Sequence, residues 1–150
     1  MARRYAHQLV FYGFLFCFAS TTTAAIYEHL LGVLAPYPFF SIPVLLGTIG
    51  GIGMLLGTAG LVWVKIKSDP APAAKSLMGA DYALLLLLFL SSATGLLLLL
   101  LRDTGAMGIL LALHLGVILS FFLTLPYSKF VHGVYRSAAL LRNAAEHPAE

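Results

Sequence analysis

Four long apolar stretches alternate with short polar or proline-containing segments along the chain. They cover residues 8–27, 43–64, 80–101 and 106–126, and each is about as long as a helix that crosses roughly 30 Å of hydrocarbon. The pattern predicts an all-α integral membrane protein, a four-helix transmembrane bundle within residues 1–143, followed by a disordered tail over residues 144–150. A soluble domain is excluded, because 60% hydrophobic and only 10% charged residues cannot supply its polar surface.

The lysines and arginines indicate which way the bundle faces. An even number of spans places both termini on one side of the membrane. Only Arg102 flanks the opposite side, whereas the shared side carries eight of the nine basic residues: Arg3, Arg4, Lys65, Lys67, Lys75, Lys129, Arg136 and Arg142. Because cytoplasmic loops are enriched in Lys and Arg, we expect both termini in the cytoplasm and a multi-pass location in the bacterial cytoplasmic (inner) membrane.

The second and third spans differ in composition. Gly50, Gly53, Gly57 and Gly60 follow the spacing that keeps residues on one helical face of the second span. Such a face favours close contact between helices, and a groove for a flat macrocycle is the alternative interpretation. The third span is mostly leucine. We interpret it as a filling or lipid-facing span with little chemical content.

Histidines in or beside the spans are the candidate site residues. His114 lies among leucines in the fourth span, where an imidazole without a partner leaves its polar nitrogens unsatisfied. His132 follows five helical turns later, about 27 Å along one continuous helix. Pro126 is expected to kink or end that helix. His7 and His29 bracket the first span, at its cytoplasmic and outer ends respectively.

The expected topology places these histidines at two levels, with His7 facing His132 and His29 facing His114. Two imidazoles that project into one gap from neighbouring helices can bind the iron of a b-type haem on both faces. The two separations differ by about 6 Å of helical rise, which tilt or the Pro126 distortion would absorb. The alternative for His7, His29 and His132 is an interfacial histidine exposed to water.

Several segments resemble a known family. The runs are RRYAH, FYGFLFCF, APYPFFSIPVLLGTIGGIGMLLGTAGL, LALHLG and LTLPYSKFVHGVYR, and they cover the chain from Arg3 to about Asn143. They resemble the membrane domain of the tricarballylate/citrate-utilisation protein B family, which is similar in general form to the gamma subunit of respiratory nitrate reductase. The resemblance implies one or two b haems as cofactors. The candidate axial ligands that it suggests are His7, His29, His114 and His132.

The same resemblance implies a b-type cytochrome membrane subunit that passes electrons from a cytoplasmic flavin and iron–sulfur dehydrogenase to membrane quinone. Iron–sulfur and flavoprotein subunits are the expected partners on the basic cytoplasmic face, because the single cysteine, Cys17, cannot ligate a cluster alone. We expect a quinone site at the outer end near Tyr27, Glu28, His29 and Tyr37. From a different class, the alternative is a cofactor-free membrane scaffold or a small transporter with protonatable histidines.

Overall fold

A computed structural model describes residues 2–67 and 75–146, apart from the side chains of residues 75–78, 80, 81, 129, 130 and 132–134. Its helices are α1 (Ala2–His29), α2 (Ile42–Lys67), α3 (Lys75–Leu100), α4 (Met107–Thr124), the short 3-10 helix η1 (Leu125–Tyr127) and α5 (Lys129–Glu146). Residues 68–74 between α2 and α3 lie outside the described residues, as do residues 147–150 of the predicted disordered tail. Residues 144–146 of that tail belong to α5.

Four helical segments in this part of the chain are long and apolar enough to cross a membrane. They are Ala2–His29, Ile42–Lys67, Tyr82–Leu100 and Met107–Tyr127. The described part of the chain is thus all-helical, as predicted, and it has the predicted four helices that are long and apolar enough to cross a membrane. The cytoplasmic location of the termini stays a prediction.

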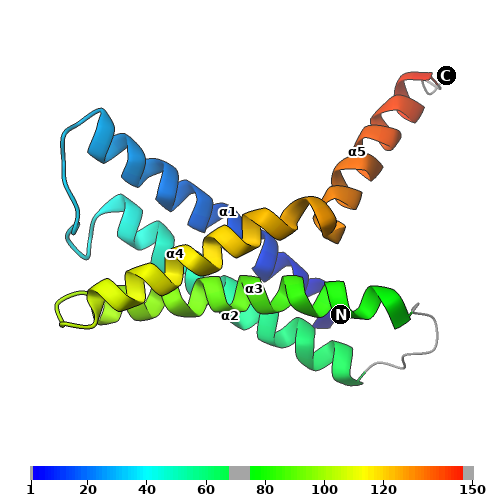
Figure 1. Cartoon of the computed structure of the whole chain (residues 1–150). Helices are drawn as coiled ribbons and strands as arrows, with labels where there is room; N and C mark the ends of the chain where they lie inside the picture. The colour runs from blue at the N-terminus through cyan, green and yellow to red at the C-terminus, as the bar shows by residue number, and fades with distance from the viewer. Residues whose placement is uncertain (1, 68–74, 147–150) are drawn as a thin grey trace.

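Successive helices run back and forth through the bundle. The loop between α1 and α2 and the turn between α3 and α4 lie at one end, whereas α1 begins and η1 lies at the other (Figure 1). The helices pack in chain order, α1 on α2, α2 on α3 and α3 on α4. A small core joins all four where Met54, Leu88 and Phe121 are buried and Phe14 packs against them. Because α1 and α4 are not neighbours in this order, the Phe14–Phe121 ring contact, with centroids 5.9 Å apart, is an important link between them.

Large apolar side chains are exposed on the outside of the bundle, and several polar side chains are buried inside it. Large apolar side chains such as Phe18 and Leu119 are about 60% exposed, whereas the side chains of Thr58, Ser92 and Thr94 are buried. This distribution suits a hydrocarbon environment, in which apolar side chains face lipid and polar groups must find partners inside the protein.

Glycines bring the backbones of α1 and α2 into contact. A Cβ atom added at Gly13 would lie 2.6 Å from the backbone nitrogen of Met54, and one added at Gly57 would lie 2.7 Å from the backbone nitrogen of Val10. Gly50 has the same relation to Gly13, at 2.7 Å from its carbonyl oxygen. The glycine face of α2 is thus filled by α1, which is the close helix packing predicted from the spacing rather than a groove for a macrocycle.

The fourth span and α5 do not form one helix. α4 ends at Thr124, the 3-10 turn of Leu125–Tyr127 contains Pro126, and Ser128 is extended (φ −93°, ψ 167°) before α5 begins. α5 consequently leaves the bundle in a new direction (Figure 1). The predicted effect of Pro126 is confirmed, and His114 and His132 lie on two separate helices rather than on one face of a continuous helix.

Candidate functional site

A half-open cavity of about 290 Å³ lies between α1, α2, α3 and α4. Its wall combines leucine and glycine with several polar groups. The polar lining residues are Cys17, Ser20, Thr21, Tyr37, Thr48, Ser91, Ser92 and His114. No Lys, Arg, Asp or Glu belongs to the described lining of this cavity.

Most hydroxyl groups of the cavity have already donated their proton to a backbone carbonyl. Ser20 on α1 donates across to the carbonyl oxygen of Pro43 on α2 at 2.6 Å. Thr48 and Ser92 donate to carbonyl oxygens in the preceding turn of their own helices, at 2.7 and 2.9 Å. A hydroxyl has one proton and two lone pairs, so these groups present acceptor lone pairs to the cavity. The Thr21–Thr23 run bonds back to its own helix in the same way.

His114 is joined to α3 by a hydrogen bond between its Nδ1 and the Thr94 Oγ1, at 2.9 Å. The Thr94 hydroxyl donates its proton to the carbonyl oxygen of Leu90 at 2.6 Å. When the Thr94 proton is directed to that carbonyl oxygen, the hydroxyl oxygen accepts from His114, in the imidazole tautomer that carries its proton on Nδ1 and a lone pair on Nε2. Because His114 lines the cavity, the imidazole adds an acceptor to a wall already made of acceptors.

Gly95 has no side chain, so the imidazole of His114 can lie close to the backbone of α3. A Cβ atom at this position would lie 3.1 Å from the Cε1 of His114, so the ring lies directly over the α3 backbone. The interpretation of the third span as chemically featureless was wrong, because α3 supplies both Thr94 and Gly95. The signal in the sequence was the run Ser91–Gly95, which interrupts the leucines with small and hydroxylated residues.

The other predicted histidines lie elsewhere. His7 and His29 are both exposed on α1, and His29 is the last residue of that helix. His132 lies in α5, and its side chain is outside the described part of the chain. The α1 residues that share the cavity with His114 lie between Cys17 and Ala24, so the structure brings His114 to Thr94 rather than to His29. Within the described residues, no three His, Cys, Asp or Glu side chains gather as a metal site.

The predicted quinone residues are partly together. The rings of Tyr27 and Tyr37 meet edge to face with centroids 5.7 Å apart, and the Tyr37 hydroxyl donates to the carbonyl oxygen of Ala24 at 3.0 Å. Glu28 and His29 are exposed beside them at the end of α1. Tyr37 also lines the cavity, so this end of the bundle and the cavity share a wall.

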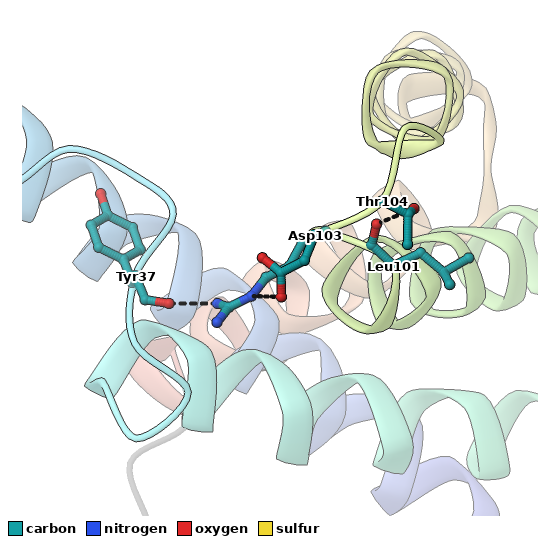
Figure 2. A network of polar contacts seen from close by, with 5 residues as sticks. Tyr37, Leu101, Asp103 and Thr104 are labelled. Atoms are coloured by element: carbon teal, nitrogen blue, oxygen red, sulfur yellow. Dashed lines mark hydrogen bonds and ion pairs between the residues drawn. The ribbon is translucent and has the colours of Figure 1, made fainter.

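Arg102 fastens the loop that carries Tyr37. Its guanidinium donates to the Tyr37 carbonyl oxygen at 2.6 Å and lies 3.7 Å from the Asp103 carboxylate (Figure 2). It also lies 3.7 Å from the ring centroid of Phe39. Only 16% of the arginine side chain is exposed. The sequence analysis used Arg102 only as a charge at the outer end, because its contact is with a loop 65 residues away in the chain.

Comparisons with known proteins give one family. The family model described as Citrate utilization protein B matches residues 1–150. Among curated proteins, the Citrate utilization protein B of Escherichia coli is 51% identical over 146 residues, which are 97% of this chain and 38% of that protein. The chain therefore spans well under half the length of the curated relative that it matches. No solved structure matches the chain.

These findings correct the predicted function. The names of the family and of the relative refer to the utilization of citrate, and neither refers to a cytochrome or to electron transfer. The prediction of a b-type cytochrome subunit that passes electrons from a dehydrogenase to quinone is therefore wrong. The physical reason lies in what a membrane histidine requires. Any partner satisfies a buried imidazole, and the Thr94 hydroxyl already satisfies one nitrogen of His114, so the residue type alone did not select a chemistry.

Proposed function

Because the chain belongs to the citrate utilization protein B family, we propose that it is the membrane-spanning part of a protein that serves the utilization of citrate. Two findings support the proposal: the family match extends over the whole chain, and four helices are long enough to anchor it in a bilayer. The relative is much longer than this chain. A role of this chain in citrate utilization is therefore proposed from the family name and the match, and not carried over from the relative as a finding.

We infer further that the cavity between the four spans is the working site and that it binds a small polar ligand. The bond between His114 and Thr94 carries this inference, because it leaves Nε2 of the imidazole as an acceptor at the cavity wall. The hydroxyl oxygens of Ser20, Thr48 and Ser92, whose protons are donated to backbone carbonyls, are acceptors as well. A carboxylate would meet lone pairs on this wall without a cation to balance its charge. The cavity therefore suits a hydroxyl group or a protonated carboxyl group, both of which citrate can present.

Haem b and quinone as cofactors stay predictions, as do the iron–sulfur and flavoprotein partners. One observation is compatible with metal ligation at His114. A metal-bound imidazole usually directs its second N–H to an oxygen acceptor, as His114 does to Thr94. His7, His29 and His132 remain the other candidate ligands. An absorption spectrum of the purified, dithionite-reduced protein tests this prediction. A missing haem Soret band after expression with sufficient haem would refute it.

Growth on citrate tests the proposed function. Deletion of the gene from its host should slow or abolish growth on citrate and leave growth on glucose unchanged. The full-length protein should restore growth on citrate, whereas its His114→Ala variant should restore it poorly. Leu115→Ala is the matched control, because Leu115 is the exposed neighbour of His114 on α4 and should behave as wild type.

The two parts of the proposal can fail separately. Normal growth of the deletion strain on citrate would overturn the proposed role in citrate utilization. If the deletion abolishes growth but His114→Ala restores it fully, the role stands and the assignment of the cavity as the working site is refuted. Membrane fractionation with detection of the variant protein shows that His114→Ala is present in normal amounts.

A further inference from the structure

The helix α5, Lys129–Glu146, is the one long helix in the described chain that is not part of the bundle. It packs against η1 and otherwise projects away from the four spans (Figure 1). It is also outside the set of helices that are apolar enough to cross a membrane. Its role must therefore differ from that of α1–α4, and its sequence indicates what that role is.

α5 is amphipathic, with most of its apolar residues on one side, whereas Leu140, which is 61% exposed, lies on the other side. At 100° per residue, Val131, Ala138, Leu141 and Ala145 fall within an arc of about 80°. Arg136 and Asn143 fall on the opposite side of the helix. Leu141 is 72% exposed, so the bundle does not cover the apolar side at this point. An exposed apolar stripe of this kind requires an apolar surface to contact.

The position of α5 in the chain identifies that surface. The segment Met107–Tyr127 is long and apolar enough to cross a membrane, and α5 begins two residues after it ends. Tyr127, at the junction, is 89% exposed, and an exposed tyrosine at the end of a span is typical of the interface between lipid and water. The chain therefore emerges at the bilayer surface, and α5 starts there with its apolar stripe uncovered.

The charges of α5 favour an anionic surface. Its described charged side chains are Arg136, Arg142 and Glu146. Arg142 and Glu146 form an ion pair at 2.7 Å, which leaves Arg136 as an unbalanced positive charge on the polar side. We propose that α5 lies on the surface of a membrane containing anionic lipid, with the Leu141 side inserted at the boundary between headgroups and acyl chains. This proposal does not depend on the function proposed above.

A polarity-sensitive fluorophore attached to single cysteines tests the proposal. The 150-residue chain is placed in nanodiscs that hold one copy each, in a Cys17→Ala background so that only the introduced cysteine of this chain reacts. The two labelled variants are Leu141→Cys on the apolar side and Asn143→Cys on the polar side. We expect emission from the Leu141→Cys label to be shifted to the blue relative to the Asn143→Cys label. The shift should be larger in phosphatidylcholine with phosphatidylglycerol than in phosphatidylcholine alone.

A variant with fewer positive charges tests whether α5 is attracted to anionic lipid, apart from the insertion of its apolar side. Arg136→Gln together with Arg142→Gln should reduce the difference between the two lipid compositions without altering the four spans. Equal emission from the two labelled positions in both lipids would overturn the proposal. A blue shift that appears only when several copies share one membrane would also overturn it, because the apolar side would then be covered by a second copy of the chain.

Discussion

The two pairs of helices in the bundle, α1 with α2 and α3 with α4, are held together by different means. α1 and α2 touch through their backbones, since Gly13, Gly50 and Gly57 leave no side chain between them. α3 and α4 are rich in leucine, and their specific contact is the hydrogen bond from His114 to Thr94. The contact between α1 and α2 requires that glycine has no side chain, whereas the contact between α3 and α4 requires a hydrogen-bonding side chain on each helix.

This difference teaches where the bundle can change. Where two helices touch through their backbones, no side chain can change rotamer to make room for an added methyl group. Such an interface therefore tolerates larger residues poorly. An interface built around an imidazole can adjust by small ring movements, but it loses its function if the polar atoms are exchanged. Arg102 links the two pairs, because it follows α3 and holds the loop between α1 and α2.

The largest effect is expected from an added methyl group between α1 and α2. Gly13→Ala places a Cβ atom 2.6 Å from the backbone nitrogen of Met54, and a backbone atom cannot turn away. We expect the free energy of unfolding to fall by about 3 kcal/mol, measured by denaturation in detergent micelles. The matched control is Gly108→Ala in α4, where, apart from the neighbouring residues and backbone of its own helix, nothing lies within 4 Å of the new Cβ. Equal stability of the two variants would contradict the backbone contact.

A smaller loss is expected when the link between the two pairs is removed. Arg102→Ala deletes a charged hydrogen bond to the Tyr37 carbonyl and the contact with the Phe39 ring. The expected loss is about 2 kcal/mol in the same denaturation experiment. Arg142→Ala, which removes only an exposed ion pair within α5, should cost about 0.5 kcal/mol or less. If both arginine variants cost the same, Arg102 does not hold the loop.

The contact between α3 and α4 should respond to Thr94→Val with a loss of about 1 kcal/mol, the typical value for a hydrogen bond between membrane helices. The more specific measurement is the ¹⁵N spectrum of the His114 ring. We expect the proton on Nδ1 in the wild type and a mixture of both tautomers in Thr94→Val. Thr94→Ser should restore the wild-type spectrum. Thr22→Val, on the exposed side of α1, removes a similar back-bonded hydroxyl and should leave the His114 spectrum unchanged.

The smallest loss of stability is expected from Gly95→Ala. It is the same glycine-to-alanine change as Gly13→Ala, but made between α3 and α4. The new Cβ would lie 3.1 Å from the Cε1 of His114, and the ring can move by a few tenths of an ångström. We expect a loss of about 1 kcal/mol or less, together with a shifted ¹⁵N signal of His114. A loss as large as that of Gly13→Ala would remove the distinction between the two interfaces.

The sequence allowed the spans, the Pro126 break and the glycine contact to be predicted, because each is a property of local composition or helical spacing. The partner of His114 could not be predicted in the same way. It depends on the rotation of α3 about its axis, and a run of leucines with a near-uniform surface does not reveal that rotation. The contact of Arg102 with Tyr37 depends on the path of a distant loop. The predicted function failed for another reason, since histidines in a membrane fit several chemistries and the family name favours citrate utilization.

The glycine contact between α1 and α2 also has a consequence for how the protein is made. All its residues lie within the first 67 positions of the chain, in two consecutive helices joined by a short loop. Membrane helices insert first and associate afterwards, so this hairpin can close while the ribosome is still synthesising α3. The finished hairpin then presents Gly51, the position over which Leu96 of α3 lies. Biogenesis would thus proceed from the N-terminus, with each inserted helix completing the surface on which the next one docks.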